Sequence, residues 1–218
     1  MTAQERALEA TAEFLFDRPG GNELFNPYHD HNPSVDRADA VEIRRSNLAS
    51  YFASCADRPR LFLLAEAPGP WGCRFSGVPI TSESQLLDPD FPISGGQSSL
   101  KETPYKEYSA GIFWRLLADV FPDFVVWNAC PFHPHKADEP FTIRAPRQTE
   151  LRTFAPLVAE LIDIFRPKKV LAVGRRAERT LADTGIEATY VRHPSQGGAT
   201  AFRAGVLEAL SEGGIAHG

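Results

Sequence analysis

Three polar residues stand where short apolar stretches of the chain end, and their side chains could do chemistry together. Glu66 directly follows an apolar run, Asn128 is the last residue of another, and His193 follows a short run that ends in Val191-Arg192. An amide offers a donor and an acceptor, the pattern needed to read the edge of a base or of another amide. A histidine can donate to an oxygen that becomes negative or act as acid or base, and a carboxylate can position water. Each residue alone could equally be a turn former, a surface side chain or a cap, but the combination favours a site.

The elements that must position these residues follow from the hydrophobic pattern. Short apolar runs bounded by Pro, Gly or charge predict buried strands at 61–65, 124–128, 169–173 and 188–192. Helical spacing predicts helices at 1–17, 36–55, 109–120, 175–183 and 200–210, and another that ends at 166. This alternation predicts an α/β fold, a four-stranded parallel sheet flanked by helices on both faces. The carboxyl ends of the strands then meet at one edge, where open α/β folds bind ligands.

The chain has 218 residues and shows no repeat, linker or step in composition, so we expect one domain. Residues 1–60 are expected to be its helical N-terminal part, 61–212 the α/β core, and 213–218 a frayed tail. Segments 18–33 and 129–136 are expected to be loops. Segment 84–108 is irregular, and a loop of this length is typical of a lid or a binding loop.

The composition places limits on the class of protein. A hydrophobic content of 43%, a charged content of 23% and a net charge of −5 indicate a soluble globular protein, not a basic nucleic-acid coat. The three cysteines form no CxxC pair, which argues against a disulfide framework and a four-thiolate metal site. No signal peptide or run of 18 apolar residues is present, so we expect a reduced, cytoplasmic protein without a membrane span.

Three smaller motifs have both a functional and an ordinary interpretation. The pairs His133/His135 and His29/His31 have spacing compatible with metal ligation, but no further ligands stand nearby, so we expect no metal. Cys130 lies beside histidines yet lacks the surroundings of a nucleophile, and buried packing is favoured. The segment 174–176, Gly-Arg-Arg, could open a phosphate-binding helix, although this motif is weak alone.

Basic residues gather in or just after the loops at the predicted edge. On an acidic protein such a group predicts a surface that follows phosphates, although ordinary solvated arginines would give the same pattern. The residues are Arg74, Lys136, Arg144, Arg147, Arg175, Arg176, Arg192 and Arg203.

Several motifs, in this order, resemble the signature elements of the uracil-DNA glycosylase superfamily. The segment 66–69, Glu-Ala-Pro-Gly, is similar to its first signature loop, and 193–195, His-Pro-Ser, to its second. Phe75 is similar to the phenylalanine that stacks on the extruded uracil, and Asn128 to the asparagine that reads its amide edge. The segment 165–174 is typical of the third strand, and the resemblance spans roughly 61 to 210.

The resemblance implies a monofunctional enzyme that flips uracil out of DNA and hydrolyses its N-glycosidic bond, leaving an abasic site. It implies catalysis by His193, which would stabilise the uracil anion, with Glu66 and Asn128. The residues that it implies at the base are Phe75, Asn128, Ala65, Ala67 and Gly69. Those expected to bind DNA are Ser195, Gln196, Gly197, Gly198, Arg74 and Arg192. Single- or double-stranded DNA would be the partner, the protein a monomer, and no cofactor is expected.

Two positions depart from the best-known branch of the superfamily. Ala67 replaces an aspartate that activates water, so Glu66 or a water held by Asn128 must substitute. Gly69 replaces a tyrosine that excludes the methyl group of thymine, which leaves open whether thymine, hypoxanthine or xanthine is also a substrate. The branch that shares Glu-Ala-Pro-Gly usually carries four cysteines for an iron–sulfur cluster; with three, this chain resembles a cluster-free branch.

Two alternatives from other classes remain open. Because Ala67 removes the usual water activator, the protein could bind uracil-containing or abasic DNA with little turnover. A metal-assisted hydrolase built on the histidine-rich loop after Asn128 is the other.

Overall fold

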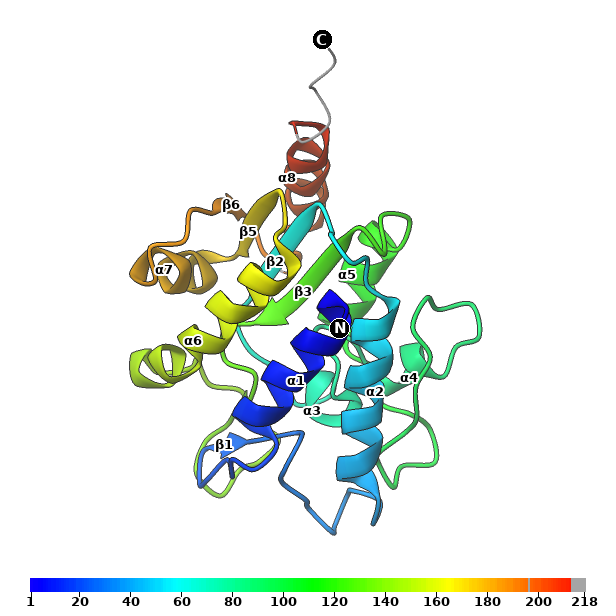
Figure 1. Ribbon diagram of the computed structural model, residues 1–218. Coiled ribbons are helices and arrows are strands. Elements are labelled where there is room, and N and C mark those ends of the chain that lie inside the picture. The colour runs from blue at the N-terminus through cyan, green and yellow to red at the C-terminus, as the bar shows by residue number, and fades with distance from the viewer. Residues whose placement is uncertain (196, 213–218) are drawn as a thin grey trace.

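The computed structural model describes residues 1–195 and 197–212, and its centre is a parallel β-sheet (Figure 1). The sheet has four strands in the order β3-β2-β5-β6. Their bounds are β2 (Leu61–Ala65), β3 (Phe124–Asn128), β5 (Lys169–Val173) and β6 (Thr189–Val191). Every residue of β2 and β3 is buried, because helices cover both faces, and this is why these strands read as continuous apolar runs. The predicted α/β fold is confirmed, with β6 one residue shorter at each end.

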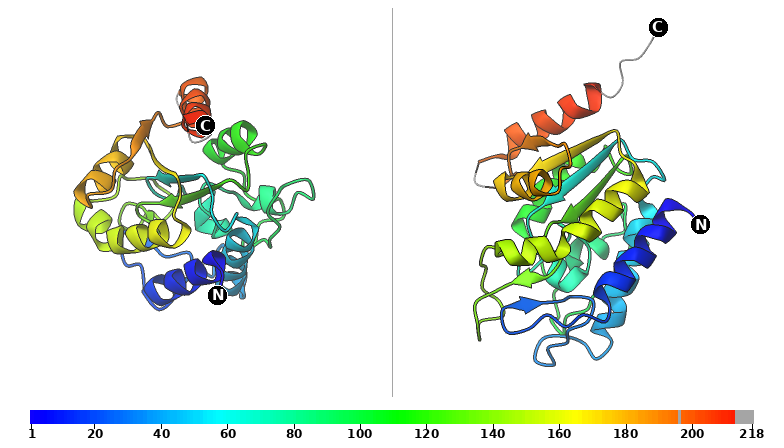
Figure 2. Two further views of the ribbon diagram at one scale, coloured as in Figure 1. Left: turned by 45° about the horizontal axis from the view of Figure 1, so that its top comes forward. Right: turned by 60° about the vertical axis from the view of Figure 1, so that its left-hand side comes forward.

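The helices form a layer on each side of the sheet (Figure 2). One layer holds α1 (Ala3–Leu15), α2 (Ala40–Ser54) and α6 (Gln148–Phe165), and the other holds α5 (Tyr108–Leu117) and α8 (Ala199–Glu212). Helix α7 (Arg175–Asp183) packs against β5 and β6. All six helices were predicted from the sequence, with bounds that differ by a few residues.

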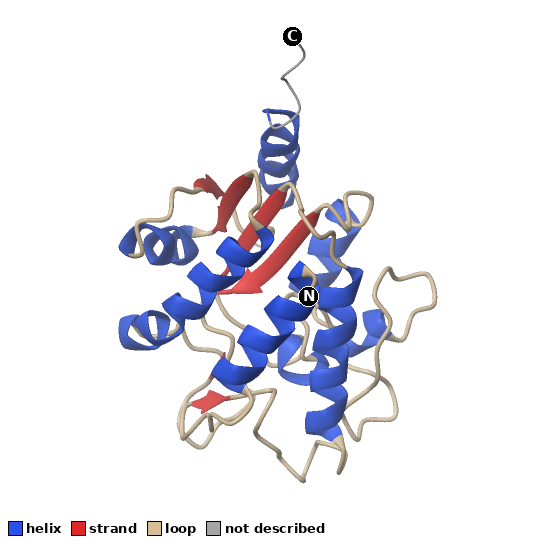
Figure 3. Ribbon diagram, in the orientation of Figure 1, coloured by secondary structure: helices blue, strands red, loops and turns tan. Residues whose placement is uncertain are grey.

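Four short elements were not predicted. Strands β1 (Leu24–Phe25) and β4 (His133–Pro134) pair antiparallel, away from the main sheet, where loops were expected (Figure 3). Helices α3 (Cys73–Ser76) and α4 (Glu83–Leu86) also lie in segments expected to be irregular. Elements of two to four residues carry no periodicity, and β1 finds its partner more than 100 residues away, so no local pattern marks them.

The long segment that was predicted to be a lid is anchored by one buried carboxylate. Glu83 accepts hydrogen bonds from the backbone N–H groups of Ser98 and Ser99, both at 2.8 Å, and from the Ser99 hydroxyl at 2.7 Å. Charge-assisted bonds of this kind are among the stronger ones in proteins. They fix the middle of the segment against α4.

At one point of the β3 edge of the sheet, a tyrosine of α2 takes the hydrogen bonds that a further strand would make. β3 is an edge strand, and the Tyr51 hydroxyl accepts a hydrogen bond from the Val126 N–H and donates one to the Val126 carbonyl, both at 2.8 Å. Both polar backbone groups of Val126 are therefore paired without a neighbouring strand.

The expected frayed tail, 213–218, lies outside the described residues. Within the described part of the chain, no helix has the length and apolar character needed to cross a membrane.

Candidate active site

A cavity of about 50 Å³ lies where β2 and β6 end, and it brings the two candidate loops together. Glu66 from the loop after β2 and His193 from the loop after β6 both line it, as predicted from their positions at strand ends. The full lining is Ala65, Glu66, Ala67, Pro68, Gly69, Cys73, Ile80, Glu107, Ser109, His193 and Pro194. The cavity therefore contains five of the predicted site residues, Ala65, Glu66, Ala67, Gly69 and His193.

Asn128 does not line this cavity but lies directly beside it. It pairs in register with Ala65 at the ends of β3 and β2, and the pairing continues with a bond from Ala129 N–H to the Ala65 carbonyl at 2.8 Å. The residue is 2% exposed, and its buried Oδ1 has no hydrogen-bond partner among the described residues. A buried unpaired acceptor is costly, and such groups occur where a ligand completes the bonding.

His193 is held in one tautomer by the loop that carries it. Its Nδ1 accepts the backbone N–H of Ser195 at 3.2 Å and lies 2.8 Å from the Ser195 hydroxyl oxygen. Because Nδ1 is the acceptor, the neutral ring carries its proton on Nε2. Burial lowers the pKa of His193, and the nearby negative charge of Glu66 partly opposes this change. The structure therefore favours a neutral imidazole with an Nε2–H donor at pH 7.

The loop after His193 requires glycines for its close packing. A Cβ on Gly198 would collide with the His193 carbonyl, and Gly197 has a φ of +76°, which favours glycine. The Gly198 N–H donates to the Ser195 carbonyl at 3.0 Å, which closes the loop beneath the histidine. Gln196, predicted to bind DNA, lies outside the described residues.

A second, larger cleft of about 440 Å³ opens beside the cavity and shares Glu66 and His193 with it. Four arginines line it, Arg175, Arg176, Arg179 and Arg192, together with Ser195 and others. The N-terminus of α7, with its unpaired N–H groups, begins at this cleft and adds positive potential. Arg179 was not singled out from the sequence, although it lies one helical turn after Arg175 and therefore on the same face.

Glu66 is connected to this cleft by an ion pair. Its Oε1 lies 2.8 Å from Nη1 of Arg176, and both side chains are partly exposed. The pair fixes the position of the carboxylate between the cavity and the cleft.

Of the eight basic residues expected to form one surface, only Arg175, Arg176 and Arg192 line the cleft. Arg144 binds Glu150, Arg147 binds Glu23, and Arg203 binds Asp119 and the Leu116 carbonyl. These three arginines link structural elements to one another instead.

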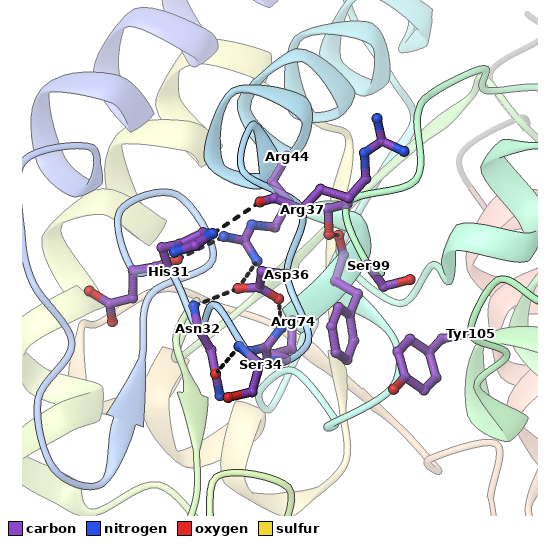
Figure 4. Close-up of polar contacts among 12 residues, drawn as sticks. His31, Asn32, Ser34, Asp36, Arg37, Arg44, Arg74, Ser99 and Tyr105 are labelled. Carbon is purple, nitrogen blue, oxygen red and sulfur yellow. Dashed lines mark hydrogen bonds and ion pairs between the residues drawn. The ribbon is translucent and has the colours of Figure 1, made fainter. Parts of the chain in front are cut away.

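Arg74 is buried, so the expectation that it contacts DNA is wrong. The residue is 0% exposed, and its guanidinium binds Asp36 at 2.7 Å; the same carboxylate binds buried Arg44 at 3.2 Å (Figure 4). The guanidinium carbon lies 4.0 Å from the ring centroids of both Phe25 and Phe75. Burial lowers the pKa of Arg74, and Asp36 opposes this change. The guanidinium group of Arg74 therefore packs on the ring of Phe75 inside the protein.

Phe75 is fully buried in a stack of aromatic rings. The ring of Tyr105 stacks on it with centroids 4.3 Å apart, and the nearly parallel rings of Trp71 and Phe141 lie 6.5 and 6.4 Å away. Tyr105 therefore covers a ring that was expected to meet the base. This contact could not be predicted from the sequence, because Tyr105 comes from the long irregular segment.

The histidine-rich loop and Cys130 have structural partners. His133 donates from Nδ1 to the Pro68 carbonyl at 2.9 Å, and burial lowers its pKa to about 4. Cys130 is buried, and burial raises its pKa to about 12, so its thiol is protonated at neutral pH. Within residues 1–195 and 197–212, no group of three His, Cys, Asp or Glu side chains is placed to hold a metal ion.

The family model of the uracil DNA glycosylase superfamily matches residues 52–209. This match covers more than half of the chain, and the protein belongs to that superfamily. The crystal structure of wild-type SMUG2 from Pedobacter heparinus is similar in fold, with a TM-score of 0.66. The two sequences are 12% identical, and the match covers 97% of this chain and 98% of that one. Family membership supports a DNA glycosylase, a hydrolase that acts in DNA repair.

Proposed function

We propose that the protein is a monofunctional glycosylase that removes uracil from DNA. One observation carries the proposal: Glu66 and a neutral His193 meet in one cavity, and that cavity opens beside a cleft lined by four arginines. Arginines neutralise phosphates, and a base that leaves the helix beside them enters the cavity. Ser195, Gly197, Gly198 and Arg192 are the proposed contacts of the loop with the DNA strand.

His193 is proposed to stabilise the leaving base. As the bond between the base nitrogen and C1′ breaks, its electrons move onto the uracil ring and a carbonyl oxygen becomes negative. The Nε2–H of His193 donates to that oxygen in a site that excludes water, where one such donor is worth about 10²–10³ in rate. A neutral imidazole is suited to this role because its Nε2–H donates without the ring first taking up a proton.

Asn128 and Glu66 are proposed to complete the reaction. The buried Oδ1 of Asn128 is an unpaired acceptor, and the N3–H of uracil is a donor that would satisfy it. Glu66 positions water near C1′, with Arg176 holding its carboxylate. Water supplies its oxygen to the sugar, and a proton goes to the departing base, so the products are free uracil and an abasic site.

Phe75 is proposed to stack on the base after Tyr105 has moved away. Tyr105→Ala should then leave uracil excision unchanged or raise it, because the covering ring is gone. A tenfold loss of kcat/KM in this variant would instead place the base on Tyr105.

The test uses oligonucleotides with one uracil, single-stranded or paired with guanine or adenine, treated with alkali after incubation. We expect strand breaks at the uracil, and none in the matched oligonucleotide with cytosine. An absence of breaks at every enzyme concentration would contradict the proposal.

A second function is favoured by one observation, namely that Ala67 offers no carboxylate and Glu66 is already ion-paired. The protein would then bind uracil-containing or abasic DNA with little turnover. A gel shift specific for such DNA, without release of base, would support binding over catalysis.

A further inference from the structure

Glu107 lines the cavity of the proposed active site but has no role in the reaction described above. It comes at the end of the long irregular segment and is the last residue before α5. Its carbonyl accepts the Gly111 N–H at 3.0 Å, and its Oε1 accepts the Ser109 hydroxyl at 2.9 Å. Both its backbone and its carboxylate are therefore fixed.

The carboxylate of Glu107 occupies a niche formed by two glycines of the first loop. A Cβ on Gly69 would lie 2.5 Å from Oε1, and a Cβ on Gly72 would overlap the carboxylate. Neither position can carry a side chain while Glu107 is in place. The wall of the cavity at Gly69, where the sequence indicated an opening, is therefore built by Glu107.

The carboxyl group of Glu107 lies in a desolvated position. Among the described residues it has no ion-pair partner, and burial raises its pKa, with the hydrogen bond from Ser109 acting in the opposite direction. The titratable groups that line the same cavity are Glu66, Cys73 and His193.

We propose that Glu107 is the specificity-determining residue of the base pocket, where its carboxyl group closes the wall at Gly69 beside the flipped base. This inference rests on the proposed glycosylase function. Uracil fits against the wall, and thymine is excluded because its additional methyl group meets the Glu107 side chain. Removing that side chain opens the niche and admits the methyl group.

The test compares Glu107→Ala and Glu107→Gln with the wild type on two duplexes, one with a uracil–guanine and one with a thymine–guanine mispair. The measured quantity is the ratio of kcat/KM for thymine to that for uracil, or its upper limit. One methyl group in a pocket is worth about 10–200-fold, so we expect Glu107→Ala to raise the ratio at least tenfold. Glu107→Gln keeps the volume and should leave the ratio near that of the wild type.

Glu102→Ala is the matched control, because Glu102 is exposed in the same segment and the substitution removes the same side chain. Its ratio should equal that of the wild type. If Glu107→Ala does not fold, Glu107→Asp is used for the same comparison. Its shorter side chain keeps the carboxyl group but moves it away from Gly69.

Two results would contradict the proposal, and they differ in whether they also contradict the glycosylase function. The role of Glu107 is rejected, and the glycosylase function stays intact, if Glu107→Ala is active and has the wild-type ratio. The same holds for Glu107→Asp when it is used in place of Glu107→Ala. A wild-type protein that releases no uracil from single- or double-stranded DNA rejects both the role of Glu107 and the glycosylase function.

Discussion

The two sides of the candidate active-site cavity use the same kinds of residue in opposite ways. On the side of β4 and α3, which we call the closed side, Arg74 and His133 are both 0% exposed. On the side of α7 and β6, the open side, the Arg176 side chain is 50% exposed and His193 is half-buried. The closed side holds a guanidinium among aromatic rings, whereas the open side presents guanidinium groups to solvent.

The two histidines differ in the direction of their hydrogen bonds as well. Nδ1 of His133 donates to the Pro68 carbonyl, whereas Nδ1 of His193 accepts the Ser195 N–H. The proton of a neutral ring is therefore on Nδ1 in His133 and on Nε2 in His193. Residue type alone does not decide which histidine can serve a reaction; the partner of Nδ1 does. We expect changes on the closed side to alter stability and changes on the open side to alter turnover and DNA binding.

The largest effect is expected on the closed side, from Asp36→Ala. This change leaves the guanidinium groups of Arg44 and Arg74 buried without their shared carboxylate, which costs about 3–5 kcal/mol of unfolding free energy. Urea unfolding measures it. Asp39→Ala is the control, because its pair with Arg37 is exposed and should be worth about 0–1 kcal/mol. Equal losses in the two variants would contradict a special role for the buried cluster.

On the open side, His193→Ala should reduce kcat for uracil excision by about 10²–10³, the value of one donor to a developing oxyanion. Its unfolding free energy should change by less than that of Asp36→Ala. Single-turnover assays separate the chemical step from product release. Near-normal turnover would remove His193 from the proposed mechanism.

Acid should weaken the closed side through His133. Its pKa is about 4 in the folded protein against 6.5 for an ordinary histidine, so the unfolded chain takes up the proton first as the pH falls. The stability contributed by the neutral ring is complete above pH 6.5 and is lost on the way to pH 4, about 3 kcal/mol in all. Urea unfolding at several pH values measures the slope. His133→Gln should reduce this dependence of stability on pH. An unchanged slope would mean that other groups cause the acid sensitivity.

The smallest effect is expected for a single arginine of the cleft. Arg179→Gln should weaken DNA binding several-fold and lower the slope of log affinity against log salt by about 1, as expected for one lost phosphate contact. Arg203→Gln is the control because Arg203 binds Asp119 and lies outside the cleft. Fluorescence anisotropy at several salt concentrations gives both slopes. Identical slopes for the two variants would contradict the assignment of the cleft to DNA.

The sequence predicted the parts of the fold that local patterns encode. β2, β3 and β5 were placed with their observed bounds, because each is an apolar run that a proline, glycine or charge terminates. The positions of Glu66 and His193 at strand ends followed from the order of strands and helices. β1 and β4 could not be predicted, since two-residue strands depend on a partner far along the chain.

Burial of charged side chains was the other part that the sequence could not supply. Arg74 was expected at the surface, but its partner Asp36 lies 38 residues earlier. Glu107 and Tyr105 enter the site from a long segment whose path depends on the Glu83 anchor. Residues brought in by tertiary contacts of this kind leave no periodic signal.

The Tyr51 hydroxyl also bears on how the protein behaves at high concentration. An edge strand with unpaired N–H and C=O groups is a template on which another chain can add a strand and begin to aggregate. At Val126, in the middle of β3, both groups are already bonded to Tyr51. A foreign strand would have to displace a buried hydroxyl before it could form a continuous ladder on β3, so a single side chain opposes strand addition at this edge of the sheet.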